Sequence, residues 1–165
     1  MKKIASALAI VIALCVLAVS SPPASAGTAT ANLSVSVNVD ASCSLATTPL
    51  TFVGYSPLNA NPDNSTGAVI LTCTSGTSAT IDLDVGSHAV GAQRKLQSGA
   101  AGTVNYNLYQ DVNRSAAWGS GATALAVSAA PDTNPRSYTV YGQIPAQQNA
   151  ASGTYTDTVV ATVNF

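Results

Sequence analysis

Few side chains in this sequence could carry out acid–base or nucleophilic chemistry. The 165 residues include one histidine, three cysteines and seven acidic residues. The histidine, His88, follows Gly86 and Ser87 in a turn-like stretch, and we expect an exposed loop side chain with no acid or nucleophile identifiable beside it. Catalysis by proton transfer or covalent attack needs several such groups in one constellation. The sequence therefore predicts a protein that is not an enzyme and that holds no small-molecule cofactor.

Metal binding has one weak candidate. Asp82 and Asp84 are two residues apart in a stretch of alternating polarity, so both carboxylates fall on one face of a predicted strand. This pattern is typical of a solvated strand face, and a calcium pair is the alternative interpretation. A single histidine such as His88 is not a metal site by itself, so we predict no metal centre.

The N-terminal residues indicate export. Two lysines, Lys2 and Lys3, precede an apolar run over residues 4–19, which ends in Ser20-Ser21-Pro22-Pro23 and is followed by the small residues 24–26. This order is typical of a secretory signal peptide, so we predict a signal peptide over residues 1–26 and a new N-terminus at Gly27. The alternative is a retained membrane anchor, but the run is shorter than the roughly 20 residues that a spanning helix needs.

Export determines the expected state of the cysteines. Cys15 lies inside the apolar run and leaves with the signal peptide, so that Cys43 and Cys73 remain. Two cysteines in an oxidising compartment allow one intramolecular pairing. We therefore predict a Cys43–Cys73 disulfide and no metal binding by this pair.

The charge of the mature chain argues against two classes of partner. Without Lys2 and Lys3, four cationic side chains remain against seven aspartates, a net charge of −3. The cations are scattered along the sequence, which gives no basic patch for nucleic acid or anionic lipid. We therefore exclude both as partners.

Periodicity indicates β-structure throughout the mature chain. From Ala29 to Asp40 apolar and polar residues alternate without a fault, which predicts a strand of about a dozen residues with one apolar face. The apolar residues of this N-terminal stripe are Ala29, Ala31, Leu33, Val35, Val37 and Val39.

Further strands are expected between turn signals. The candidate segments are residues 48–53, 68–74, 80–85, 103–110, 123–128 and 137–144, with a loop over 54–66. Several short strands separated by Gly, Pro and Asn are typical of a β-sandwich. The aromatic cluster of Tyr106, Tyr109 and Trp118, with Leu108, is interpreted as core, and a sugar-binding surface is the alternative.

The C-terminal residues 153–165 predict a second long amphipathic strand. One face of this strand carries Tyr155, Asp157, Val159, Ala161, Val163 and Phe165.

Several strings along the mature chain form one recognisable series. They are Val37-Asn38-Val39-Asp40-Ala41-Ser42-Cys43, Leu50-Thr51-Phe52, Leu71-Thr72-Cys73-Thr74-Ser75-Gly76-Thr77, Tyr106-Asn107-Leu108-Tyr109-Gln110-Asp111 with Arg114 and Trp118-Gly119, Tyr141-Gly142, and the tail from Gly153. In this order they resemble the spore coat protein U domain family, which includes subunits of archaic chaperone–usher pili. The similarity extends over essentially the whole mature chain.

The resemblance implies an all-β, immunoglobulin-like β-sandwich that lacks its last strand and leaves a groove beside the C-terminal strand. A periplasmic chaperone first lends a strand to this groove, and the N-terminal extension of the next subunit then replaces it at an outer-membrane usher, which is strand addition between chains. The N-terminal stripe is then the donor strand. The acceptor strand is formed by Tyr155, Val159, Ala161, Val163 and Phe165, with a chaperone cation on the terminal carboxylate.

The expected organisation is a signal peptide over 1–26, an extension over 27–42 that supplies the donor and a first strand, and a sandwich domain over 43–165. The resemblance implies passage through the periplasm to the cell surface as a structural pilus subunit that serves adhesion and biofilm formation. A spore-coat or surface-matrix protein with the same fold is the alternative, and a carbohydrate-binding module is a third possibility.

Overall fold

The computed structural model describes residues 23–99 and 102–165. Residues 1–22, which contain most of the predicted signal peptide and Cys15, lie outside the described residues. The chain divides into an N-terminal unit that ends at Val37 and a second unit that runs from Asn38 to Phe165.

The N-terminal unit contains no regular structure in its described part. Residues 23–42 form no helix or strand, and all of them are exposed; Leu33 is 87% and Val35 85% exposed. The expected strand over Ala29 to Asp40 is therefore wrong for the single chain. A strand needs a neighbour for its backbone N–H and C=O groups, and the first strand of the second unit begins only at Cys43.

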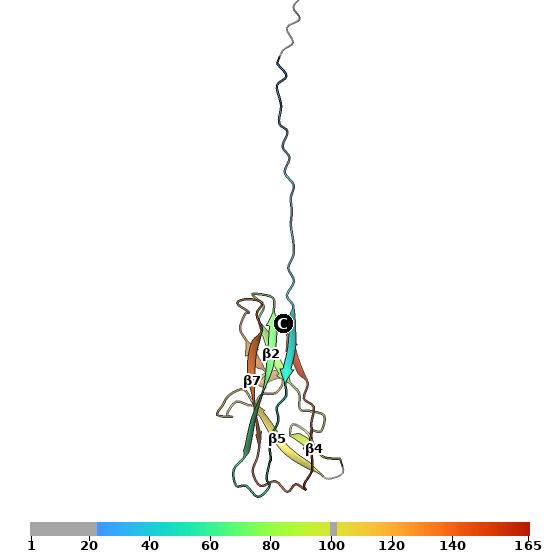
Figure 1. Cartoon of the computed structure of the whole chain (residues 1–165), viewed down its shortest axis with the longest axis vertical. Helices are drawn as coiled ribbons and strands as arrows, with labels where there is room; N and C mark the ends of the chain where they lie inside the picture. The colour runs from blue at the N-terminus through green and yellow to red at the C-terminus, as the bar shows by residue number, and fades with distance from the viewer. Residues whose placement is uncertain (1–22, 100–101) are drawn as a thin grey trace, which may run out of the picture. The chain divides into compact units, whose positions relative to one another are not determined.

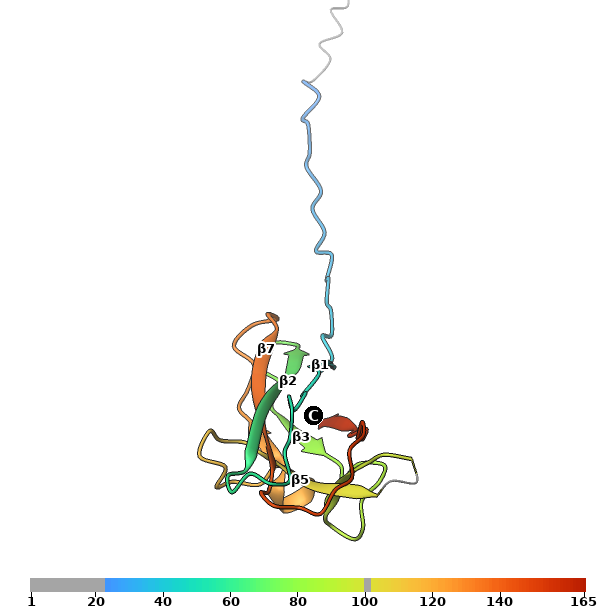
Figure 2. The ribbon, with the colours of Figure 1, turned by 60° about the horizontal axis from the view of Figure 1, so that its bottom comes forward.

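The second unit is built from two antiparallel sheets (Figures 1 and 2). The five-stranded sheet has the order β1 (Cys43–Thr48), β2 (Asp63–Cys73), β7 (Arg136–Ile144), β5 (Thr103–Tyr109) and β4 (Arg94–Gln97). The three-stranded sheet has the order β6 (Leu125–Val127), β3 (Ala79–Leu83) and β8 (Ala161–Asn164). A short 3-10 helix, Gly121–Thr123, precedes β6. The predicted all-β sandwich is confirmed.

The period of two determines which side chains meet between the sheets. In β2 the odd-numbered residues from Gly67 to Cys73, which include Val69 and Leu71, are buried, while the residues between them are partly exposed. Trp118 is 1% exposed, and its indole nitrogen donates a hydrogen bond of 2.9 Å to the carbonyl oxygen of Ile81. Tyr106 and Leu108 are buried as well. The interpretation of the aromatic cluster as core is confirmed for these residues.

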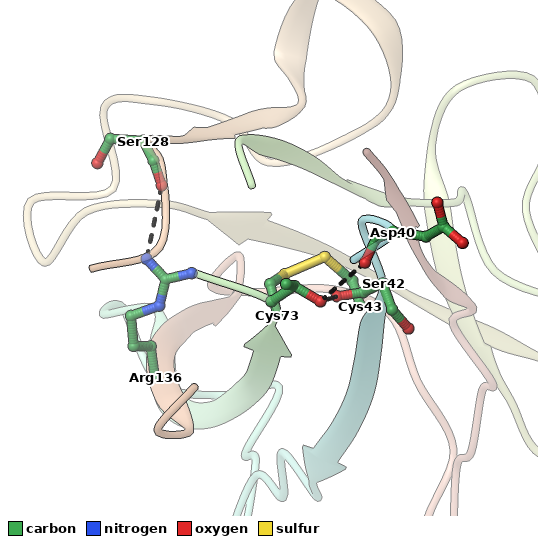
Figure 3. Close-up of a disulfide and its surroundings, with 7 residues drawn as sticks. Asp40, Ser42, Cys43, Cys73, Ser128 and Arg136 are labelled. Atoms are coloured by element: carbon green, nitrogen blue, oxygen red, sulfur yellow. Dashed lines mark hydrogen bonds between the residues drawn. A yellow bond between two sulfur atoms is a disulfide. The ribbon is translucent and has the colours of Figure 1, made fainter. Parts of the chain in front are cut away.

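The predicted disulfide is present (Figure 3). Cys43 opens β1 and Cys73 closes β2, and the two residues are directly paired in the register of these strands. Beyond them the pairing continues, because Thr74 donates its backbone N–H to the carbonyl oxygen of Ser42 at 2.8 Å. The segment before Cys43 therefore follows the line of β1.

Some strand boundaries differ from the prediction. The segment 49–53 forms no strand, and β2 begins at Asp63, inside the predicted loop. Strand β4 was not predicted, because its sequence Arg-Lys-Leu-Gln has only one apolar residue and shows no alternation. The last strand is also shorter than expected, because only Ala161–Asn164 pairs with β3, although Thr156 forms an isolated bridge with Gln97.

Among the described residues, no helix is long and apolar enough to span a membrane.

Candidate functional site

Two of the four edge strands in the described part of the second unit, β1 and β8, lie close to each other. β1 pairs only with β2, and β8 pairs only with β3, so each strand ends the order of its sheet. The two strands approach each other, yet no backbone ladder joins them. Figure 2 shows β1 and the C-terminal strand, in dark red, on the two sheets. Unpaired edges of this kind present free N–H and C=O groups to an additional strand.

A groove opens between these edges. Its volume is about 330 Å³, and its walls are formed by residues 47–50 with Phe52 on one side and residues 157–159 with Ala161 on the other. The floor consists of core side chains, namely Val69, Leu83, Leu96, Tyr106, Leu108 and Val140. A second hollow of about 810 Å³ adjoins the groove and shares Leu50, Phe52, Leu96 and Asp157 with it. The hydrophobic core is thus open along one side.

Leu50 and Phe52 cover part of the inner face of the five-stranded sheet. Both side chains lie over Gly142 of β7, and a Cβ atom there would lie 2.8 Å from Leu50 and 2.9 Å from Phe52. A Cβ atom at Gly67 of β2 would lie 3.0 Å from Leu50. Glycine at these two positions therefore makes room for the side chains at the groove wall.

The C-terminal segment forms the opposite wall. Its odd-numbered residues from Tyr155 to Val163 are partly buried, and the even-numbered residues between them are exposed. The predicted alternation is therefore present, although Phe165 at the end is 58% exposed. The segment starts beside β4 at Thr156 and ends on β3. It therefore crosses from one sheet to the other.

A buried polar cluster lies where the C-terminal segment crosses between the sheets. Asp157 accepts a hydrogen bond of 2.6 Å from the hydroxyl of Tyr106, and its other oxygen lies 3.0 Å from Nδ1 of His88. The Asp157 side chain is 2% exposed. The expectation that His88 has no acid beside it is therefore wrong, because the fold brings in a carboxylate from 69 residues further along the chain.

Burial shifts two pKa values in this cluster. Desolvation, followed by the hydrogen bond to Asp157, raises the pKa of Tyr106 far above its usual value of 10.0. Desolvation lowers the pKa of Arg94, while Tyr106, Asp84 and Asp157 oppose the shift. The Arg94 guanidinium is buried against the carbonyl oxygens of Leu83 and Asp84. The hydrogen bonds thus link β5 to the C-terminal segment through Asp157, and β4 to the end of β3 through Arg94.

The two aspartates considered for calcium bind protein groups instead. One oxygen of Asp84 accepts hydrogen bonds from the backbone N–H groups of Gly86 and Val160. Asp82 accepts hydrogen bonds from Gly121 and from the side chain of Asn164. In the part of the chain that the structure describes, no group of three or more His, Cys, Asp or Glu side chains could hold a metal ion.

The sequence prediction covered only part of this site. Of the predicted acceptor residues, Tyr155, Val159 and Ala161 line the two hollows, whereas Val163 and Phe165 are not among the lining residues. The wall residues Leu50 and Phe52 and the buried Asp157–Tyr106 pair were not predicted as site residues. Two features of the sequence could have indicated them. Leu50 and Phe52 are large apolar residues in a turn-rich segment before β2, and Asp157 is a charged residue on the apolar face of the last strand.

Three comparisons place the chain among known proteins. A family model described as the Spore Coat Protein U domain matches residues 29–162. Protein U of Myxococcus xanthus is 36% identical over 132 residues, which cover 70% of this chain and 71% of that protein.

A solved structure shows the same fold. It is the crystal structure of the CsuC–CsuE chaperone–tip adhesion subunit pre-assembly complex, from archaic chaperone–usher Csu pili of Acinetobacter baumannii, with a TM-score of 0.57 and 21% identity. The match covers 77% of this chain but only 40% of the solved chain. The extent of the family match and the identity to Protein U show that this chain belongs to the Spore Coat Protein U domain family, whose members are structural proteins and not enzymes.

Proposed function

We propose that this protein is a structural subunit of a surface pilus that is assembled by a chaperone–usher pathway through donor-strand complementation. One observation carries the proposal: a groove floored by core side chains lies between the unpaired edges of β1 and β8. A strand inserted there gains backbone partners and buries its apolar side chains together with the floor. The sandwich is then complete only in an assembly.

The occupant that fits this groove is the N-terminal segment of a second copy of the chain. Its stripe from Ala29 to Val39 alternates apolar and polar residues and is exposed, with Leu33 and Val35 among the most exposed apolar side chains. A segment with period two presents one apolar face to a groove. Such a segment matches the apolar floor and the two open edges.

Local geometry favours donation to another copy over filling the chain's own groove. Ser42 continues the pairing of β1 through its bond from Thr74, and Asp40 accepts a weaker contact of 3.4 Å from the Thr74 hydroxyl (Figure 3). These bonds keep residues 40–42 extended in line with β1. A hairpin back along the open edge of β1 would then need a chain reversal inside the N-terminal stripe, before Asp40. Head-to-tail donation between copies instead produces a fibre.

The proposed pathway requires two further partners. A periplasmic chaperone fills the groove before assembly, and an outer-membrane usher exchanges the chaperone strand for that of the next subunit. The fold likeness to the chaperone–tip adhesion subunit pre-assembly complex supports a chaperone as the first partner. The predicted signal peptide supports export to the periplasm and then the cell surface, where a polymer of this chain would serve adhesion and biofilm formation.

A spore-coat or surface-matrix structural protein is the second candidate. The 36% identity to Protein U and the family description favour it. In this role the same groove would join subunits within a layer, without an usher. A chaperone gene and an usher gene beside the gene for this chain favour the pilus, and their absence favours the coat.

The proposal is tested by exporting the full chain to a bacterial periplasm, alone and together with its neighbouring chaperone. Alone, the chain is expected to aggregate or to be degraded, because its core is open on one side. With the chaperone it should be recovered as a soluble complex, measured by size-exclusion chromatography with light scattering. A stable, fully folded monomer without any chaperone would contradict the missing-strand model.

A further inference from the structure

Residues 154–160, the segment that contains the groove wall at residues 157–159, are held to the rest of the fold by few backbone hydrogen bonds. Apart from the Thr156 bridge to Gln97, their contacts to the β3–β4 connection are the bonds from Ser87 N–H to Thr158 O, at 3.1 Å, and from Asp84 N–H to Val160 O, at 3.0 Å. Regular pairing with β3 begins only at Ala161. This wall adjoins an open groove, so other interactions must prevent it from closing onto the apolar floor.

Two aspartate side chains supply these interactions. One extends from the β3–β4 connection to the wall, and the other extends from the wall to the β3–β4 connection. Asp84, at the end of β3, accepts the Val160 N–H at 3.0 Å. Asp157, in the wall itself, accepts the backbone N–H of His88 at 3.2 Å, together with the His88 ring and the Tyr106 hydroxyl. Two carboxylates, one on each segment, thus bond the segment opposite.

Asp157 is the member that faces the groove. It lines both hollows, between the wall and the floor formed by Tyr106 and Leu96, and it is nevertheless almost fully buried. A carboxylate in this position is stable only while its hydrogen-bond donors surround it. Moving the wall away from the β3–β4 connection and towards the floor would remove the His88 backbone N–H and ring from it.

We propose that Asp157 is a positioning residue that keeps the acceptor groove open for strand uptake. This inference rests on the proposed function, since it assumes that a strand enters the groove. Asp157 fixes the wall to the β3–β4 connection through His88 and to β5 through Tyr106. The wall is therefore in place before a strand arrives, which lowers the cost of ordering it during binding.

A matched control is available in the same pair of elements. Asp82 of β3 also bonds the C-terminal segment, at the Asn164 side chain, and accepts the Gly121 N–H. It lines neither hollow. Replacing it removes a carboxylate and a bond to the last strand without changing the groove wall.

The experiment uses the full exported chain with Val35→Asp, purified as its chaperone complex so that it stays soluble. The substitution prevents the N-terminal segment of the chain itself from competing for the groove, and peptide uptake is followed as exchange for the chaperone strand. The probe is a fluorescent synthetic peptide of residues 27–42 with the natural sequence, and its association is followed by anisotropy. Asp157→Ala, Asp157→Asn and Asp82→Ala are compared, with thermal midpoints and hydrogen exchange of the Ser87 and Val160 amides recorded for each variant.

We expect Asp157→Ala to slow peptide uptake by about tenfold or more, because hydrogen bonds to a charged group are lost. The Ser87 and Val160 amides should exchange faster in the same variant. Asp157→Asn keeps an acceptor oxygen and should recover most of the rate, and it carries the test if the alanine variant does not fold. Asp82→Ala should stay within about twofold of the parent chain.

Two results separate this inference from the proposed function. If the parent chain binds the peptide and Asp157→Ala binds it as fast as Asp82→Ala, the inference is overturned and the donor-strand proposal stands. If the parent chain binds no peptide, the donor-strand proposal fails, and hydrogen exchange then tests whether Asp157 holds the wall in place. Faster exchange confined to Ser87 and Val160 in Asp157→Ala supports this role of Asp157. Unchanged exchange overturns it.

Discussion

Single residues of this protein have structural roles rather than catalytic ones. The sequence contains few titratable groups, and the ones that meet, Asp157, Tyr106, Arg94 and His88, bond each other and backbone carbonyls. The cysteine pair could be predicted because only one pairing remained after export. The partner of His88 could not be predicted, since no local pattern connects residues 88 and 157 before the fold is known.

Tyr106 should resist ionisation in alkaline solution. Its folded pKa is raised, so its contribution to stability is present below the unfolded value near 10 and is lost as the pH rises above that value. An ultraviolet absorbance titration should show that one of the six tyrosines ionises only when the protein unfolds. Tyr106→Phe should remove this late step, and an unchanged titration curve in that variant would assign the effect to another tyrosine.

The disulfide should contribute strongly to stability. It closes a loop with a sequence separation of 30 residues, for which the loss of chain entropy in the unfolded state predicts about 3 to 4 kcal/mol. Cys43→Ser should therefore lower the free energy of unfolding of the chaperone-bound subunit and its periplasmic yield. Urea unfolding and immunoblots measure these effects. A yield equal to that of the parent chain would show that the bond is dispensable.

At the scale of elements, periodicity predicted most strands and failed where tertiary context decides. The alternation in residues 103–110 and 137–144 matched β5 and β7 closely, because both strands have one face in the core. The stripe from Ala29 to Val39 has the best alternation of the chain and yet forms no strand, because no strand among the described residues pairs with it. Residues 153–160 alternate less regularly, since Asp157 lies on the inner face and Val160 on the outer face, and this segment crosses between the sheets.

The C-terminal strand should contribute to partner capture through its last residue. Phe165 is more than half exposed in the subunit, and burying it fully against a chaperone is worth roughly 1.5 to 3 kcal/mol. Deleting Phe165 should therefore weaken chaperone binding about tenfold or more in a periplasmic pull-down. Val160→Ala is the control, because Val160 is also exposed but points to the opposite face of the segment. Equal capture of both variants would remove Phe165 from the acceptor strand.

At the scale of the whole molecule, the two ends of the chain have complementary properties. The sandwich has an open groove beside its last strand, and the N-terminal segment has an apolar stripe without a partner. The family resemblance and the long stripes could be obtained from the sequence. The groove itself could not be obtained in this way, because its walls combine residues 47–52 with residues 157–161.

The period of two makes the central claim testable with neighbouring residues. Leu33→Asp and Val35→Asp place a carboxylate on the apolar face, where insertion into the groove would cost several kcal/mol or force protonation. Ser34→Asp places the same charge on the opposite face, where it stays in water. All three variants should remain folded and chaperone-bound, since residues 33–35 are exposed in the subunit.

The most direct measurement is polymer length of these three variants, observed by electron microscopy and by gel electrophoresis of unboiled samples after export with chaperone and usher. Donation of the N-terminal stripe predicts polymers for Ser34→Asp and none for Leu33→Asp or Val35→Asp. Equal polymerisation of all three variants would contradict the donor-strand account.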